Sequence, residues 1–252
     1  MSTAPIPGAP PASAPASLSV LQRFVAIFAR PTEAWTGLRE RAQWWWPLAV
    51  ALAVTCAGTL ALHERALMPM LTAQWDQAVA DGQMPAAQAD QMEAFFAGPG
   101  GISFLVAQQV VAFLLMTLLV ALLVWFGLAF AVGVPMRFRW AFEVTCWSWL
   151  VSLPGTLLTY TLAWFKESFE GVRIGFGLLV PEPETPNRML TALATFLDGL
   201  GPFQIWWLVV TILGAAALTG APRRLVARWL SAIYVVVLLV VAGAAAMFSR
   251  GG

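Results

Sequence analysis

Five long apolar stretches constrain this chain more than any other feature of its sequence. They cover residues 44–62, 102–134, 140–165, 203–221 and 229–248. A helix needs about 20 apolar residues to cross ~30 Å of hydrocarbon, because it rises ~1.5 Å per residue. The stretches do not alternate polar and apolar residues as the strands of a membrane barrel do. We therefore predict an all-α integral membrane protein, a bundle of five transmembrane helices spanning the lipid bilayer.

The overall composition supports this class. Of the 252 residues, 60% are hydrophobic and 11% are charged, whereas roughly a quarter are charged in a soluble domain. The net charge of +1 gives no basic surface for nucleic acid. The second stretch exceeds the thickness of the hydrocarbon, so it must tilt or emerge from the bilayer.

The region before the first stretch divides into a tail and an amphipathic segment. Residues 1–16 are rich in Pro, Ala and Ser, which predicts a disordered tail, and they lack the basic leader and apolar block of a signal peptide. Residues 17–43 are predicted to form interfacial helices with Arg23 on the polar side and a second helix starting at Pro31. The apolar stripe of the first helix consists of Leu18, Leu21, Val25 and Phe28. This segment lies either along the membrane surface or against the protein's own cytoplasmic face.

Two long polar connections separate the apolar stretches. In the first, an apolar stripe from Leu67 to Val79 predicts one helix, and Pro85 opens a second that runs to Phe96. We expect these two helices to form an extracytoplasmic helical hairpin. The second connection, residues 166–202, is predicted to be irregular with one short helix near 188–197.

The positions of the basic residues predict the orientation of the chain. If the stretches simply alternate, nine arginines fall on the side with the short connections and five basic residues fall on the other side. The nine are Arg23, Arg30, Arg39, Arg41, Arg137, Arg139, Arg223, Arg224 and Arg228. Basic residues near short loops are retained in the cytoplasm, so the amino terminus is predicted inside and the carboxyl terminus outside.

The third stretch holds the most polar chemistry. Five of its hydroxyl residues share one helical face: Thr145, Ser148, Ser152, Thr156 and Thr159. Pro154 should kink the helix and free the carbonyl of Leu150. We favour hydroxyls that satisfy this carbonyl and bond to neighbouring helices, and the alternative is a polar path or a substrate groove.

Glu143 is the only acidic residue inside a predicted span, and such a residue is a functional candidate. Arg139 lies four residues earlier, where the two side chains can pair on one helix face. A structural ion pair is favoured over a proton relay.

Small residues recur at positions where helices could pack closely. They are Ala49, Ala53, Ala57 and Ala61 in the first stretch, Gly127 and Ala131 in the second, and the segments 214–217 and 243–246 in the last two. We interpret them as helix-packing seams.

Reactive groups are scarce. The chain has a single histidine, His63, and its two cysteines, Cys56 and Cys146, lie at depths too different for a disulfide. It has no phosphate-binding loop and no metal-ligand cluster. The sequence therefore predicts no catalytic residues, no cofactor and no metal.

Several motifs resemble those of the Yip (Ypt/Rab-interacting protein) domain family, in particular its bacterial members, over roughly residues 20–248. The residues that carry the resemblance are Pro31, Trp35, Glu143, Pro154, Asp198, Phe203, Trp206 and Gly214. The chain departs from the family pattern by extra residues, 199–202, between Asp198 and Phe203.

This resemblance implies a five-span bundle with a cytoplasmic amino terminus. Eukaryotic relatives bind small GTPases in vesicle traffic, but the composition here is typical of bacteria, where that partner is not expected. We expect a non-enzymatic protein of the bacterial inner membrane that scaffolds or regulates an export-related or envelope-related membrane complex. A small transporter or channel is the alternative, and self-association remains open.

The orientation can be tested by cysteine labelling after replacement of Cys56 and Cys146. A cysteine at Asp81 or Glu184 should react with a membrane-impermeant thiol reagent in intact cells, because both connections are predicted outside. A cysteine at Arg137 should not react. Labelling at Arg137 would overturn the predicted topology.

Overall fold

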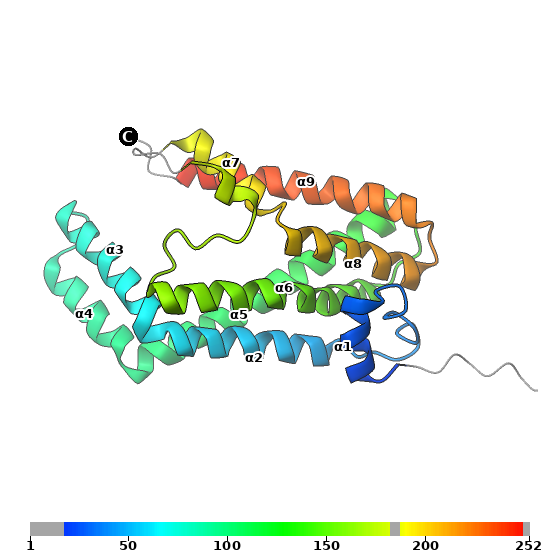
Figure 1. Ribbon diagram of the computed structural model, residues 1–252, viewed down its shortest axis with the longest axis horizontal. Helices are drawn as coiled ribbons and strands as arrows, with labels where there is room; N and C mark the ends of the chain where they lie inside the picture. The colour runs from blue at the N-terminus through cyan, green and yellow to red at the C-terminus, as the bar shows by residue number, and fades with distance from the viewer. Residues whose placement is uncertain (1–17, 182–186, 249–252) are drawn as a thin grey trace, which may run out of the picture.

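The computed structural model describes residues 18–181 and 187–248, and these residues form helices and connections with no strand. The predicted tail, residues 1–16, lies outside the described residues. The elements are α1 (Val20–Ala29), α2 (Trp45–Leu62), η1 (His63–Leu67), α3 (Met68–Ala80), α4 (Ala86–Ala97), α5 (Pro99–Phe126), η2 (Gly127–Ala131), α6 (Phe138–Lys166), η3 (Phe176–Leu179), α7 (Arg188–Asp198), α8 (Pro202–Thr219) and α9 (Arg223–Phe248). The long helices run side by side along the bundle (Figure 1).

Four helical segments are long and apolar enough to cross a membrane: residues 45–80, 99–131, 202–219 and 223–248. A chain with several such helices contacts the lipid bilayer as a multi-pass membrane protein. The fifth predicted span, α6, is 29 residues long but is not in this set. Its hydroxyl residues, proline and charged ends lower its hydropathy.

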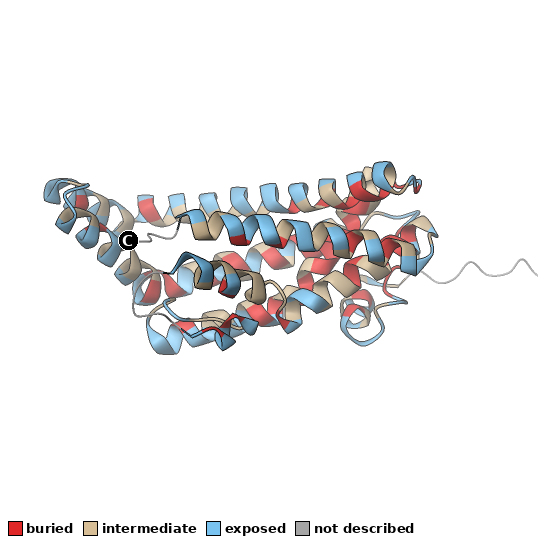
Figure 2. Ribbon diagram, turned by 90° about the horizontal axis from the view of Figure 1, so that it is seen from above, coloured by how far each residue is buried: buried red, intermediate tan, exposed pale blue. Residues whose placement is uncertain are grey.

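The position of α6 in the bundle accounts for this polarity. It packs against α2, α5 and α8, and most of its residues from Ala141 to Val151 are buried. Buried residues concentrate in the half of the bundle nearest α1, whereas α3 and α4 are mostly exposed (Figure 2). A helix enclosed by other helices can carry polar side chains because few of them meet lipid.

The hydroxyls of α6 bond within their own helix. Thr145, Thr156 and Thr159 each donate to the carbonyl four residues earlier, at 2.9, 3.2 and 3.1 Å. The expectation that they satisfy the Leu150 carbonyl or bond to neighbouring helices is therefore wrong for these three. A threonine in a helix reaches its own i−4 carbonyl without any partner helix.

The first polar connection continues directly from α2. A π-helical turn, η1, joins α2 to α3, which packs against α4. Trp75 of α3 lies against Phe96 of α4 with ring centroids 5.6 Å apart, and the His63 Nε2 atom is 3.0 Å from the Phe96 carbonyl. The extracytoplasmic location of this helix pair stays a prediction.

The amino-terminal segment differs from its prediction in two ways. Residues 31–40 form successive turns instead of a second helix, and Gly37 has a left-handed φ of 79° that an α-helix does not accommodate. In α1, Arg23 and Ile27 are buried, whereas Leu21 is 75% and Val25 58% exposed. The helix thus turns its arginine inward and its predicted apolar stripe outward. The inward side carries Arg23, the outward side carries Gln22, and both sides are otherwise apolar, so helical spacing could not decide which is buried.

The predicted packing seams are only partly correct. Ala49, Ala53, Ala57 and Ala61 are exposed, and α2 instead packs through the face that contains Gly58. A Cβ at Gly58 would overlap the ring of Tyr160 on α6, and one at Gly127 would overlap Ile233 on α9. Gly243 has no neighbouring atom within 4 Å of such a Cβ.

This contrast gives a matched pair of substitutions. Gly58→Ala should destabilise the protein by about 1–3 kcal/mol, because overpacking forces the Tyr160 ring and the α2 backbone apart. Gly243→Ala should be neutral or slightly stabilising, since alanine favours the helix and finds open space. Thermal unfolding in mild detergent measures both, and equal melting temperatures for the two variants would contradict the close α2–α6 contact.

Candidate functional site

Arg23 is the most unusual side chain of the described structure, because it is a cation with only 1% of its surface exposed. Its guanidinium donates to the carbonyl oxygens of Ala34, Thr36 (2.9 Å) and Leu18 (3.4 Å), and its Nε donates to the Gln43 Oε1 at 3.1 Å. The fork geometry of arginine suits several acceptors at once. This one side chain therefore joins α1 to the turns that follow it.

The charge of Arg23 persists despite its burial. Burial lowers the pKa of the guanidinium to about 10, and the negative charge of Glu143 opposes this shift. Arg23 also lies over the Trp147 ring, with 5.6 Å between the guanidinium carbon and the ring centroid. The side chain remains cationic at neutral pH, so it acts as a fixed charge rather than as a titrating group.

Glu143 of α6 is the second buried charge at this end of the bundle. Its Oε1 atom accepts from the Gln43 backbone N–H at 2.9 Å and from the Trp147 indole N–H at 3.1 Å. Its Oε2 atom has no hydrogen-bond partner among the described residues. Gln43 consequently bridges the two charges, accepting from Arg23 through its side chain and donating to Glu143 through its backbone.

The predicted ion pair between Arg139 and Glu143 is wrong. No pair of their charged atoms lies within 4.0 Å, although both residues belong to α6. Arg139 instead donates to the backbone carbonyl of Arg39 and, at 3.5 Å, to that of Leu38. The turns at 31–40 have backbone carbonyls that no helical N–H pairs with. Arg139 donates to these carbonyls and therefore does not pair with Glu143.

A third arginine fixes the same turns to α8. The Arg39 Nη2 atom donates to the carbonyl of Ala217 in the last turn of α8, at 2.9 Å. The segment 31–43 is therefore held by α1, α6 and α8 together. We call this segment, with Arg23, Arg139 and Glu143, the arginine-bound base of the bundle.

Two motif residues from opposite ends of the chain meet at this base. The Trp35 side chain is 3% exposed and packs on Gly214 of α8, where a Cβ would lie 2.6 Å from the indole Cζ2. Only glycine allows the ring this close. Pro31, at the start of the turns, is half-buried.

The remaining motif residues lie further along the bundle, away from the base. A Cβ at Gly155, which follows the exposed Pro154, would be 2.9 Å from the Phe203 ring. Asp198 accepts from the Gly177 backbone N–H at 3.1 Å, and Trp206 packs against the core around Trp147.

Of the extra residues 199–202, the first three form a tight turn between α7 and α8, and Pro202 begins α8. The carbonyl of Gly199 accepts from the Tyr234 hydroxyl of α9 at 2.6 Å. At Gly201, a Cβ would lie 3.0 Å from the Cα of Gly175. The departure from the family motif is thus accommodated by close backbone packing.

Sequence reasoning missed Arg23, Gln43 and Trp147 as members of one network. The sequence does mark Arg23, since it is the single charged residue of α1. Its partners are backbone carbonyls of a non-helical segment, and no sequence pattern marks such acceptors.

The arrangement offers hydrogen bonding and packing but no metal site. No group of three or more His, Cys, Asp or Glu side chains that could hold a metal ion occurs among the described residues. What the geometry defines is an all-helical, multi-pass membrane protein with buried charges at one end of its bundle.

Comparison with protein-family models identifies the family. The model of the Yip1 domain matches residues 25–245. The chain therefore belongs to the Yip1 domain family, and the resemblance found from its motifs is confirmed. Neither a curated protein nor a solved structure shows significant similarity to it.

The base can be tested through two neighbouring arginines. Arg23→Met should destabilise the protein by about 3 kcal/mol, because it leaves buried carbonyls unpaired and removes one of the two cations that act on Glu143. Arg23→Lys should recover part of this loss, since one ammonium cannot serve all the acceptors.

Arg30→Met is the matched control, because Arg30 pairs with Glu33 at 3.5 Å where both side chains are exposed. Its effect should be below about 1 kcal/mol. Similar melting temperatures for Arg23→Met and Arg30→Met would refute the role assigned to Arg23.

Proposed function

We propose that this Yip1-domain protein is a non-enzymatic scaffold or regulator of another membrane protein complex, and that it docks through α1. The observation that carries the proposal is the outward apolar face of α1, formed by Leu21, Val25 and Phe28, which are 75%, 58% and 37% exposed. An exposed apolar patch on an anchored element is typical of an interaction surface. We call these three residues the α1 face.

The rigidity of α1 supports docking by this face. Arg23 and Ile27 hold the opposite side of the helix on the bundle, and a capping box between Ser19 and Gln22 closes its amino-terminal end. A preorganised helix loses little conformational entropy on binding. The α1 face is thus presented to a partner in a fixed orientation.

The proposal includes five crossings, with α6 as the central one. At ~1.5 Å per residue, its 29 residues extend ~44 Å, which exceeds the hydrocarbon thickness. Five crossings bring α1 and the short basic connections to the cytoplasmic side of a bacterial inner membrane and the carboxyl terminus outside. We also propose that the partner is a protein complex and that this complex serves export or the cell envelope.

The absence of enzymatic chemistry is supported by how the few reactive groups are used. His63 binds the Phe96 carbonyl through Nε2, and Glu143 is enclosed by Gln43 and Trp147. The transporter or channel alternative has less support, because three hydroxyls of the α6 face bond within their own helix.

The test is cross-linking of the full-length protein in its native membrane, followed by identification of the proteins attached to it. Leu21→Gln, Val25→Gln and Phe28→Gln together should abolish recovery of a distinct membrane complex, because they remove the apolar contact without disturbing Arg23. The matched control is Met189→Gln with Leu193→Gln on α7, which changes equally exposed apolar residues (81% and 45%) at a different place. The control variant should still recover the complex.

Two outcomes would contradict the proposal. One is retention of the same complex by the triple variant at a wild-type melting temperature. The other is recovery of only a monomer or homo-oligomer that conducts solute in liposomes, which would favour the transporter.

A further inference from the structure

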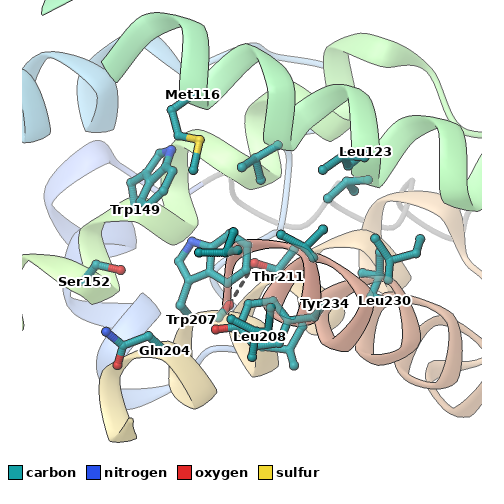
Figure 3. Close-up of a pocket in the computed structure, with 16 residues that line it drawn as sticks. Met116, Leu123, Trp149, Ser152, Gln204, Trp207, Leu208, Thr211, Leu230 and Tyr234 are labelled. Atoms are coloured by element: carbon teal, nitrogen blue, oxygen red, sulfur yellow. Dashed lines mark hydrogen bonds between the residues drawn. The ribbon is translucent and has the colours of Figure 1, made fainter. Parts of the chain in front are cut away.

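An elongated cavity of about 360 Å³ lies between α5, α6, α8 and α9. Its wall is formed mainly by aliphatic and aromatic side chains, and none of the described residues that line it is charged. The cavity belongs to the apolar part of the bundle (Figure 3), and no residue of the arginine-bound base lines it.

The cavity opens sideways because α5 and α9 diverge. The two approach closely near η2, where Gly127 meets Ile233, but α5 otherwise packs on α2, α4 and α6. Met116 on α5 and Val241 on α9 both line the cavity and are 50% and 47% exposed. Since both helices are apolar enough to span a membrane, the opening faces hydrocarbon rather than water.

Polar groups gather at one end of this cavity. Figure 3 shows Trp149, Ser152 and Gln204 at one side, with the ring nitrogen of Trp207 turned toward them, and Leu123 and Leu230 at the other side. The indole N–H groups of Trp149 and Trp207 are buried and have no acceptor among the described residues. A buried N–H donor without an acceptor is costly, so a ligand that brings acceptors is favoured here.

We propose that this cavity binds one acyl chain of a bilayer glycerophospholipid, with the ester carbonyls of that lipid accepting from the Trp149 and Trp207 indoles. The inference depends on α5, α8 and α9 lying in the bilayer and not on the proposed partner.

The chemistry of the wall selects this occupant. An acyl chain matches an apolar groove that is open to hydrocarbon, where close packing supplies dispersion attraction. A fatty-acid carboxylate would need a cation, and the lining has none. An ester carbonyl is a neutral acceptor, which suits an uncharged indole N–H donor. The chain then extends from the polar end toward Leu123 and Leu230.

The experiment uses the full chain in phosphatidylethanolamine vesicles that contain a phosphatidylcholine with a diazirine on one acyl chain. After irradiation, mass spectrometry locates the lipid adducts. Adducts should concentrate on residues lining the cavity, in excess over outward-facing residues of the same helices. A matched pair on α9 provides the control, because Val237 lines the cavity whereas its neighbour Val236 is 59% exposed and does not.

Val237→Trp should fill the groove and remove most of the cavity adducts, while Val236→Trp should leave them unchanged. Equal labelling in the two variants, adducts spread evenly over the outer helix faces, or cross-links between two copies at the cavity would each overturn the proposal.

A second variant covers the case in which Val237→Trp fails to fold. Trp149→Phe with Trp207→Phe keeps the rings nearly intact but removes both N–H donors. Each lost hydrogen bond of typical strength weakens binding roughly five-fold, so labelling of the cavity relative to the outer faces should fall at least that much. An unchanged ratio would show that no acceptor is bound there.

Discussion

Hydrogen bonding between arginine side chains and the unpaired carbonyls of residues 31–43 is the interaction on which the rest of this structure depends. The segment forms turns instead of a helix, so its backbone acceptors need partners from elsewhere. Arg23 from α1 and Arg139 from α6 supply them, while Arg39 bonds outward to α8. Three elements far apart in sequence are thereby joined at one end of the bundle. Because Arg23 is buried, the bonds that it makes to the segment also fix the orientation of α1.

The central position of α6 follows from the same packing. Glu143 of α6 accepts hydrogen bonds from the Gln43 backbone and from the Trp147 indole. The hydroxyl of Thr145 bonds within α6 itself. Enclosure by α2, α5 and α8 lets a helix with this composition sit among apolar ones. Its polarity is therefore accounted for by packing and by the contact with the base, and it gives no separate support for a transport path.

Two surfaces remain open on the bundle for different physical reasons. The α1 face is exposed because Arg23 occupies the inward side of the helix, which leaves Leu21, Val25 and Phe28 on the outward side. The lateral cavity is open because α5 and α9 separate beyond the Gly127 contact, and two indole N–H groups of its lining have no acceptor among the described residues. The first suits a protein partner and the second suits a lipid, so the two proposals concern different parts of the molecule and stand independently.

The sequence by itself determined the helical membrane class, the positions of the apolar helices, the short helix α7 and the family. Length, hydropathy and local motifs are properties of neighbouring residues, so they can be read without the fold. It identified Trp35 and Gly214 as motif residues but not as contacts. Only the tertiary structure decided that Arg23 points inward, that Arg139 serves backbone carbonyls instead of Glu143, and that the alanine stripe of α2 faces outward. The physical reason is that α1 and α2 are apolar on more than one face, so periodicity leaves several orientations open. Which face is buried is then set by distant acceptors and close glycine contacts, which no local pattern records.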